Sequence, residues 1–164
     1  AMIGFDFCYY WSHRMGHEIS ILWAAHAVHH QSEDYNLSTA LRQTSTGFLF
    51  SWIFYVPLFL LGIPFEVFVT VNALNLIYQF WVHTEHIPKL GWYEWVFVTP
   101  SNHRVHHAQN EIYLDRNYGG MFILWDRLFG SRSATVRTPE MPIGTEGLQD
   151  RGIGGLLARP FEPR

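Results

Sequence analysis

The sequence predicts an all-α protein, an integral-membrane helical bundle that holds a histidine-rich site for two metal ions. Two observations predict this fold class. The 164 residues are 48% hydrophobic and 17% aromatic but only 15% charged, which is too apolar for an ordinary soluble domain of this size. All ten histidines fall into four short clusters, with the spacings of three and four residues that place side chains on one helix face.

The first predicted element is a mainly helical, aromatic-rich stretch over residues 4–27. It carries the first cluster, His13 and His17, and leads into the second cluster. After a polar turn, Ser38 is expected to cap a further helix that begins at Thr39, because a serine hydroxyl can accept a hydrogen bond from a free backbone N–H of the first turn.

Two apolar stretches follow, and together they predict a transmembrane hairpin. Residues 47–63 carry no charge, and residues 64–81 carry only Glu66. Each is near the lower limit of the roughly 17–25 residues that span a bilayer. Gly62 and Pro64 indicate a tight turn between them. The alternative is a buried helical hairpin of a soluble protein, which periodicity does not exclude.

The hairpin predicts where the site lies, because both of its open ends must face the same side of the membrane. The second histidine cluster precedes it and the third follows it, so all four clusters can meet on one face. Positive charge marks that face as cytoplasmic in a multi-pass protein of a bacterial inner membrane or the endoplasmic reticulum. The basic residues concerned are Arg14, Arg42, Lys89, Arg104, Arg116 and Arg127. Asn72, Asn75 and Gln79 are expected to hydrogen-bond between helices; the alternative is that they line a cavity.

Beyond the hairpin, residues 92–98 form a short aromatic segment suited to the membrane interface. The last histidine cluster is predicted to lie on a helix that starts around Pro100, with Ser101 or Asn102 as its cap. Residues 1–130 are therefore predicted to form one domain. Residues 131–164, rich in Arg, Gly and Pro, are expected to be a weakly ordered tail with a short contact around Leu156 and Leu157.

The histidines predict a two-metal site. Neutral imidazole binds iron, zinc, copper and nickel, and ten imidazoles are too many for one ion but suit two ions with four or five nitrogens each. Cys8 is the only cysteine, so thiolate ligation is not expected. The candidate ligands are His13, His17, His26, His29, His30, His83, His86, His103, His106 and His107. His86 is the weakest, because it precedes Ile87-Pro88, where a helix is expected to end.

Acidic side chains beside the clusters are candidates for supporting roles. Glu18 follows His17 directly and is the predicted catalytic residue, as a partner that orients a histidine or as a proton donor. The alternative for Glu18 is a solvated helix carboxylate. Glu33, Asp34 and Glu85 are similar candidates near clusters.

The clusters and the stretches around them resemble a known superfamily. Residues 13–17, 26–30 and 103–107 are similar to the three histidine boxes of the fatty acid hydroxylase and sterol desaturase superfamily. Within it, residues 5–130 are most similar to the alkylglycerol monooxygenases and their bacterial relatives. The stretches that carry this similarity are residues 10–14, 17–18, 32–43, 78–85, 99–107 and 117–130. Other members have membrane helices before the first box, so this chain is expected to be a piece of a longer protein.

The resemblance implies a membrane-bound non-haem di-iron monooxygenase that uses O2 to hydroxylate a lipid C–H bond. The implied substrate position is the ether-linked carbon of an alkylglycerol, which yields a fatty aldehyde and glycerol. The implied cofactor is a pair of iron ions, which zinc can replace in a purified sample. Because the chain has no GxGxxG pattern, electrons must come from outside, from tetrahydrobiopterin as in the animal enzyme or from a redox partner protein.

Three alternatives stay open at this point. A sterol or fatty-acyl hydroxylase or desaturase would use the same metal chemistry. A membrane protein that binds haem through two histidines needs only a few separated histidines rather than dense boxes. A metal transporter would need ligands deep inside the spans, whereas here the histidines flank them. A nucleic-acid partner is not expected, because the net charge is −3.

Overall fold

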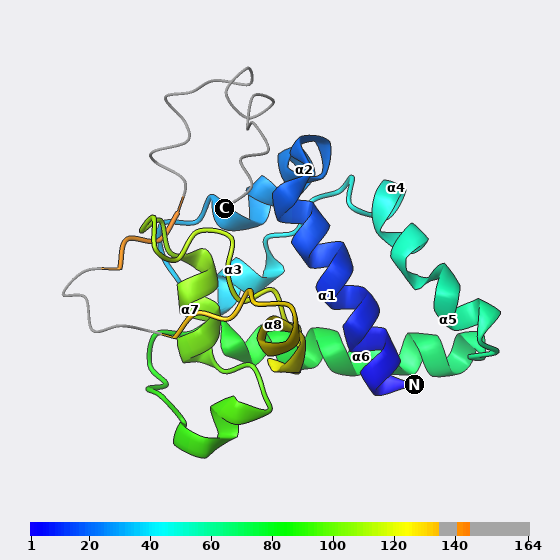
Figure 1. Cartoon of the computed structure of the whole chain (residues 1–164). Coiled ribbons are helices and arrows are strands. Elements are labelled where there is room, and N and C mark those ends of the chain that lie inside the picture. Colours follow the sequence, from blue (N-terminus) through cyan, green and yellow to red (C-terminus); the bar gives the residue numbers. More distant parts are fainter. Residues whose placement is uncertain (135–140, 145–164) are drawn as a thin grey trace.

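The computed structural model describes residues 1–134 and 141–144, and in these residues the predicted all-α character is confirmed. The regular elements of the described residues are helices, and β pairing in them is limited to two isolated bridges. In chain order (Figure 1) the elements are α1 (Met2–Glu18), α2 (Ser20–His30), α3 (Leu37–Leu41), α4 (Phe48–Ser51), η1 (Trp52–Tyr55), α5 (Val56–Leu60), α6 (Phe65–Val82), η2 (Gly91–Trp95), α7 (Pro100–His107) and α8 (Leu124–Leu128).

Helix α6 matches the second predicted span. It starts directly after Pro64, whose fixed φ suits a helix start, and continues for 18 residues. Among the described residues it is the one helix long and apolar enough to cross a membrane. Only 17% of it is buried in the protein, unlike the core helix of a soluble protein.

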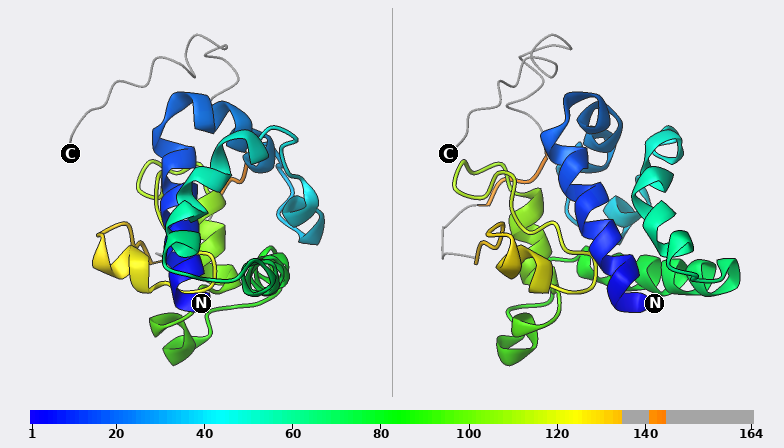
Figure 2. Two further views of the ribbon diagram at one scale, coloured as in Figure 1. Left: turned by 90° about the vertical axis from the view of Figure 1, so that its right-hand side faces the viewer. Right: turned by 45° about the vertical axis from the view of Figure 1, so that its right-hand side comes forward.

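The first predicted span differs from expectation, because residues 48–60 are divided into α4, the 3₁₀ segment η1 and α5. Pro57 lies in the first turn of α5 and has no N–H to continue the preceding helix. This segment leaves the turn at a steep angle to α6 (Figures 1 and 2). The two arms meet near the turn, where the rings of Phe59 and Phe68 lie 5.0 Å apart.

Helix α1 connects both arms to the rest of the protein. Its Phe5 ring stacks on Tyr55 of η1 at 4.9 Å. On the α6 side, Asn75 donates a hydrogen bond to buried Asp6 (3.0 Å), and Tyr9 donates one to Gln79 (2.6 Å). The predicted interhelical role is thus confirmed for these two polar residues of α6.

The two predicted helix caps are wrong by a few residues. Asn36, not Ser38, caps α3, because its side chain accepts the hydrogen bond from the Ser38 backbone N–H at 2.9 Å. Thr99 caps α7 in a reciprocal arrangement with Asn102, and Pro100 occupies the first turn. Both corrections place the cap at the residue with an extended backbone immediately before the helix.

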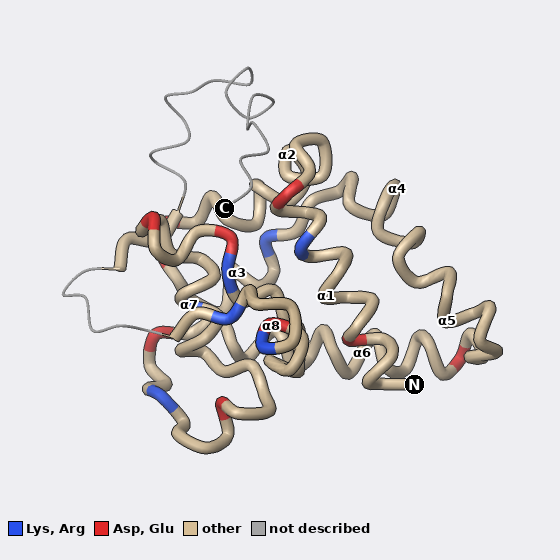
Figure 3. Tube along the Cα trace, in the orientation of Figure 1, with Lys and Arg blue, Asp and Glu red and all other residues tan. Residues whose placement is uncertain are grey.

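Charge is unevenly distributed over the fold. Figure 3 shows charged residues around the upper end of α1 and around α7 and α8, whereas the α4–α5 segment has none. Arg104 fixes the loop after α6 by donating to the backbone oxygens of Thr84 (2.8 Å) and Ile87 (3.0 Å).

Parts of the predicted tail contact the helical domain. Ser131 is buried and hydrogen-bonded to the Tyr10 hydroxyl at 2.8 Å. Ile143 packs in a core cluster with Tyr35 and Val105. Residues 135–140 and 145–164, with the contact predicted around Leu156 and Leu157, lie outside the described residues.

Candidate metal centre

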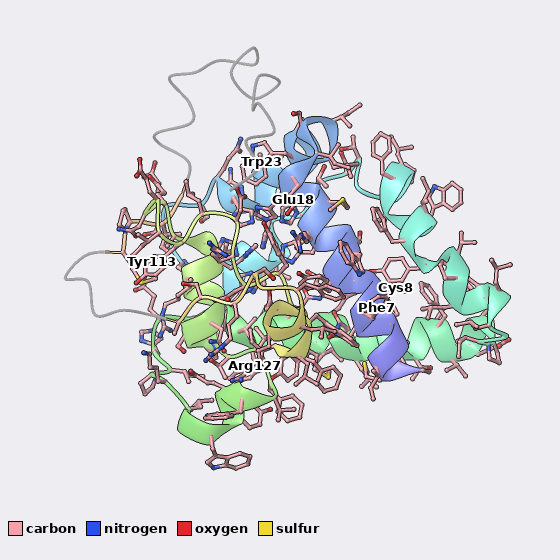
Figure 4. All side chains as sticks on the ribbon, in the orientation of Figure 1. Phe7, Cys8, Glu18, Trp23, Tyr113 and Arg127 are labelled. Carbon is pink, nitrogen blue, oxygen red and sulfur yellow. The ribbon has the colours of Figure 1, made fainter. Side chains whose placement is uncertain are left out.

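Nine of the ten histidines come together from α1, α2, the end of α6 and α7. Figure 4 shows nitrogen-bearing side chains gathered between these helices. They form two groups, in each of which the donor atoms lie within 4.8 Å of one another. Group one is His13, His17, His26, His30 and His106, and group two is His29, His83, His103 and His107. Eight of the nine are at most 6% exposed, and His26 is partly buried.

His86 is not brought to either group. It lies exposed in the loop after α6 and lines a separate surface hollow with Glu33, Asp34 and Glu85. All three of these carboxylates are exposed, and the hollow is built on the loop before α3. The structure therefore places these four predicted site residues outside the histidine groups.

Group one has the spacing that a shared ion requires. The Nε2 atom of His26 lies 3.1 Å from Nε2 of His13 and 3.2 Å from Nε2 of His30. The rings of His106 and His13 are 4.5 Å apart. Two nitrogens bound at about 2.1 Å from one ion and at a right angle would be about 3.0 Å apart. The observed distances fit that arrangement.

Group two repeats this spacing. Nε2 of His83 lies 3.2 Å from Nε2 of His29 and 3.0 Å from Nε2 of His103. The His107 ring lies 4.8 Å from that of His29. The groups adjoin, since His107 stacks on His30 of group one with ring centroids 4.3 Å apart. Two ions held in these groups would therefore be neighbours.

Backbone carbonyls orient the imidazoles from outside. The Nδ1 atoms of four histidines lie against carbonyl oxygens: His13 against Tyr118 (2.8 Å), His29 against Arg42 (3.2 Å), His83 against Gln79 (2.7 Å) and His106 against Arg116 (2.8 Å). A carbonyl only accepts, so each Nδ1 carries the proton and each Nε2 lone pair is left for a metal. His106 Nε2 and both nitrogens of His107 are buried without a hydrogen-bond partner among the described residues. A bound ion would satisfy such atoms.

Burial keeps these histidines neutral, the form that binds metal. Desolvation lowers the pKa of His13 to about 4, that of His29 to about 4 and that of His83 to about 3. For His106 and His107, burial and then the neighbouring histidines lower the pKa well below the usual value. The donor set is thus imidazole in its ligating state at neutral pH.

Asp126 supports group one, although it is not among the residues that sequence analysis predicts for the site. Its fully buried carboxylate accepts hydrogen bonds from the backbone N–H groups of Tyr118 (2.7 Å) and Gly119 (2.8 Å) and from the Ser131 hydroxyl (2.7 Å). These bonds fix the turn whose Tyr118 carbonyl orients His13. The only signal in the sequence is a carboxylate inside the apolar run 121–129.

Glu18 forms an ion pair rather than a bond to a histidine. Its carboxylate accepts from Arg14 Nε at 2.7 Å, and Arg14 also donates to the Tyr10 hydroxyl at 3.1 Å. The Glu18 side chain is 29% exposed at the upper end of α1 (Figure 4). It lies one residue beyond His17, at the border between group one and the surface.

A cavity of about 240 Å³ opens beside group one, between α1, α2 and the α4–η1 segment. His13 and His26 form part of its wall. Any ligand in this cavity would therefore lie next to the group-one nitrogens.

A family model and several named proteins are similar in sequence to this chain. The family model described as fatty acid hydroxylase matches residues 1–131. Human alkylglycerol monooxygenase is 54% identical over 134 residues, covering 82% of this chain and 30% of the relative. The Danio rerio alkylglycerol monooxygenase is 56% identical over 131 residues, covering 80% of this chain and 29% of the relative.

A bacterial relative is more distant. The ornithine lipid hydroxylase OlsE of Rhizobium tropici is 31% identical over 157 residues, covering 95% of this chain and 47% of the relative. No solved structure matches the chain significantly. The chain spans about 30% of the length of the alkylglycerol monooxygenases that it resembles. The match over residues 1–131 confirms the predicted resemblance, and the chain belongs to the fatty acid hydroxylase family.

Proposed function

We propose that this chain forms the catalytic core of a membrane-bound, non-haem di-iron monooxygenase. The observation that carries the proposal is the pair of adjoining groups of five and four buried, neutral imidazoles. When bound there, two iron ions would supply the O2 activation needed to hydroxylate an unactivated C–H bond. Zinc would bind the same nitrogens without that redox chemistry.

The proposed ligands are the nine histidines of the two groups. His86, predicted as a tenth ligand, is exposed and outside both groups, so the proposal does not depend on it. The protein's own contribution is to hold the imidazoles neutral by burial, to fix their orientation through backbone carbonyls and to exclude water. Glu18 acts at the border of group one, where its ion pair with Arg14 would position charge near an external reductant.

The proposed substrate is a membrane lipid with an ether-linked alkyl chain. Relatives at 54–56% identity are named alkylglycerol monooxygenase, and a cavity of about 240 Å³ lies beside group one. Hydroxylation of the ether-linked carbon consumes O2, two electrons and two protons and releases water. The resulting hemiacetal breaks its C–O bond to give a fatty aldehyde and glycerol. Tetrahydrobiopterin or a redox partner protein would supply the electrons.

We place the chain in the membrane through α6 and the apolar segment 47–63, as part of a multi-pass protein. In support of this, α6 is long and apolar enough to cross a membrane, and most of it is exposed. The basic residues near the histidine groups favour a cytoplasmic site, in a bacterial inner membrane or the endoplasmic reticulum.

Other members of the superfamily supply the second candidate, a sterol or acyl-lipid hydroxylase or desaturase. The identity to such relatives is lower: 31% to the ornithine lipid hydroxylase and 26% to a sterol desaturase of Gibberella zeae. Haem binding and metal transport are less favoured, because the histidines converge in dense groups rather than as separated pairs or along a span.

The test combines metal content with product analysis on the detergent-purified full-length protein. Elemental mass spectrometry should find about two metal ions per chain, as expected for two sets of four or five nitrogens. Reduced, iron-loaded enzyme incubated with 1-O-alkylglycerol under ¹⁸O2 should release labelled fatty aldehyde. Little bound metal in folded protein would contradict the metal centre, and oxidation of sterol or acyl lipid alone would select the second candidate.

A further inference from the structure

The wall of the cavity beside group one is polar near His13 and His26 and apolar at Phe54 and Tyr55. Its volume of about 240 Å³ is below the roughly 300–1,000 Å³ of pockets that enclose a whole drug-sized ligand. It would therefore enclose only part of a lipid. The remainder can extend along the exposed apolar side chains of Phe48, Leu49 and Trp52 on the adjoining segment.

Two serines provide hydrogen-bonding groups inside this cavity. Ser12 comes from α1, directly before His13, and Ser51 comes from α4. Both are half-buried, and neither hydroxyl is bonded to another described residue. Three other polar groups of the wall have partners within the protein: the Thr44 hydroxyl bonds to Thr46 (2.8 Å), the Gln43 amide nitrogen donates to Ala40 (3.1 Å) and the Tyr9 hydroxyl donates to Gln79 (2.6 Å).

The position of Ser51 points to a ligand. It lies in the uncharged stretch 47–63, where a hydroxyl facing hydrocarbon would lack partners. The structure instead directs it to the cavity wall, opposite α1. A polar atom of a bound molecule would complete the hydrogen bonding of both serines.

The apolar wall lies farther along α1, away from the metal end. Phe54 and Tyr55 of η1 line the cavity, and Tyr55 stacks on Phe5 in the first half of α1. His13 lies eight residues beyond Phe5, which is about 12 Å along a helix. An alkyl chain beside Phe54 and Tyr55 would therefore approach group one with its oxygen-bearing end first.

We propose that this cavity binds the junction between an alkyl chain and the polar head of a lipid, with Ser12 and Ser51 donating hydrogen bonds to the lipid oxygen at that junction. The alkyl chain lies along Phe54 and Tyr55. The C–H group next to the oxygen then faces His13 and His26. This inference rests on the proposed function and deepens it: group one is the side that meets the substrate, and the two serines determine which carbon is oxidised.

The first experiment measures binding without turnover, on metal-free full-length protein in detergent. A 1-O-alkylglycerol with a diazirine on its alkyl chain should crosslink to the segment 50–55, as mapped by peptide mass spectrometry. Competition with unlabelled 1-O-alkylglycerol gives an apparent Kd. We expect Ser51→Ala and Ser12→Ala each to raise it about threefold to tenfold, the effect of one neutral hydrogen bond. Ser45→Ala, an exposed serine of the same connecting segment outside the cavity, should leave it unchanged.

A second probe separates lost hydrogen bonding from altered packing. In the alkane-1,2-diol analogue, a methylene replaces the ether oxygen. The wild type and both serine variants should bind it with the same Kd, because the hydrogen-bond acceptor at the junction is gone. In the iron-loaded enzyme, the variants should also oxidise carbons farther along the chain of the 1-O-alkylglycerol.

The outcomes distinguish this inference from the proposed function. Crosslinking at 50–55 and weaker competition in the serine variants, without turnover by the wild type, would support the cavity and contradict the monooxygenase. Turnover by the wild type with serine variants indistinguishable from Ser45→Ala would overturn the serine assignment. Crosslinks elsewhere, or no saturable binding, would overturn the cavity itself.

Discussion

The burial of so many neutral histidines makes the metal-free protein sensitive to mild acid. A histidine whose folded-state pKa is lowered binds a proton more readily in the unfolded chain. Its contribution to stability is complete above the unfolded value of about 6.5 and is lost as the pH falls towards the folded value. The folded pKa is about 4 for His13 and His29 and about 3 for His83, so the window runs from about pH 6.5 down to about pH 4 for the first two and about pH 3 for His83.

The size of this effect is comparable with the stability of a whole domain. Between pH 7.5 and pH 5, each of these three histidines lowers the free energy of unfolding by about 2 kcal/mol, or about 6 kcal/mol together. Asp6 and Asp126 act in the opposite direction, because burial raises the pKa of each to about 6 and the protonation of each on acidification returns about 1 kcal/mol. The net loss from these five groups, about 4 kcal/mol, is close to the lower end of the usual total stability of roughly 5–15 kcal/mol.

We therefore expect the metal-free protein to lose its tertiary structure between about pH 6.5 and pH 4. Tryptophan fluorescence and near-UV circular dichroism in detergent would follow the transition. Metal-loaded protein should unfold at a lower pH, because the ions compete with protons for the same nitrogens. His86→Ala, which removes an exposed imidazole, should leave the midpoint unchanged. A metal-free midpoint below pH 4, or one that metal does not move, would refute the reasoning.

Three substitutions test individual parts of the site. His106→Ala should abolish turnover and lower metal occupancy, because it removes a group-one nitrogen; full activity on the lipid would contradict its role as a ligand. Asp126→Asn should lower the Tm by about 3–9 °C, since an amide cannot accept both backbone hydrogen bonds. It should also weaken metal binding about tenfold, because the turn that holds the Tyr118 carbonyl against His13 is loosened. A metal affinity equal to that of the wild type would mean that this turn does not orient His13 for metal binding. Glu18→Gln should reduce turnover but keep the metal, with a stability change below about 1 kcal/mol because its ion pair is partly exposed. Unchanged kinetics would make Glu18 a surface ion-pair partner only.

For nine of the ten histidines, the sequence was sufficient to predict that the imidazoles gather, because helical spacing is a local property. His13 and His17, four residues apart, share group one as that rule requires. The position of α6 also followed from local signals, an apolar run opened by Pro64. His86 was harder to place, since its position depends on where the chain leaves α6.

The supports of the site could not be predicted, because they come from distant backbone. The carbonyl that orients His13 belongs to Tyr118, 105 residues away, and backbone carbonyls have no residue identity to recognise. The angle of the α4–α5 segment likewise depends on packing against α1, such as Phe5 on Tyr55, rather than on hydropathy. Composition shows that residues 47–63 and 64–81 are both apolar, but it does not show the angle between them.

The division into two groups explains the doublets in the second and fourth clusters. Adjacent residues on a helix point about 100° apart, so neighbouring histidines cannot face the same ion from one helix. In α2, His30 belongs to group one and His29 to group two. In α7 the order is reversed, with His106 in group one and His107 in group two.

Each doublet therefore lies at the junction of the two groups and contributes one nitrogen to each. The stacking of His30 on His107, at 4.3 Å, is the contact where the groups meet. Helix α1 touches group one alone and has no doublet; its pair is four residues apart and serves a single group. The same rule accounts for the partner of each doublet, since His26 with His30 and His103 with His107 are also pairs four residues apart that stay within one group. A helix with a histidine doublet thus lies between the two histidine groups, and a helix with a simple pair lies beside one group.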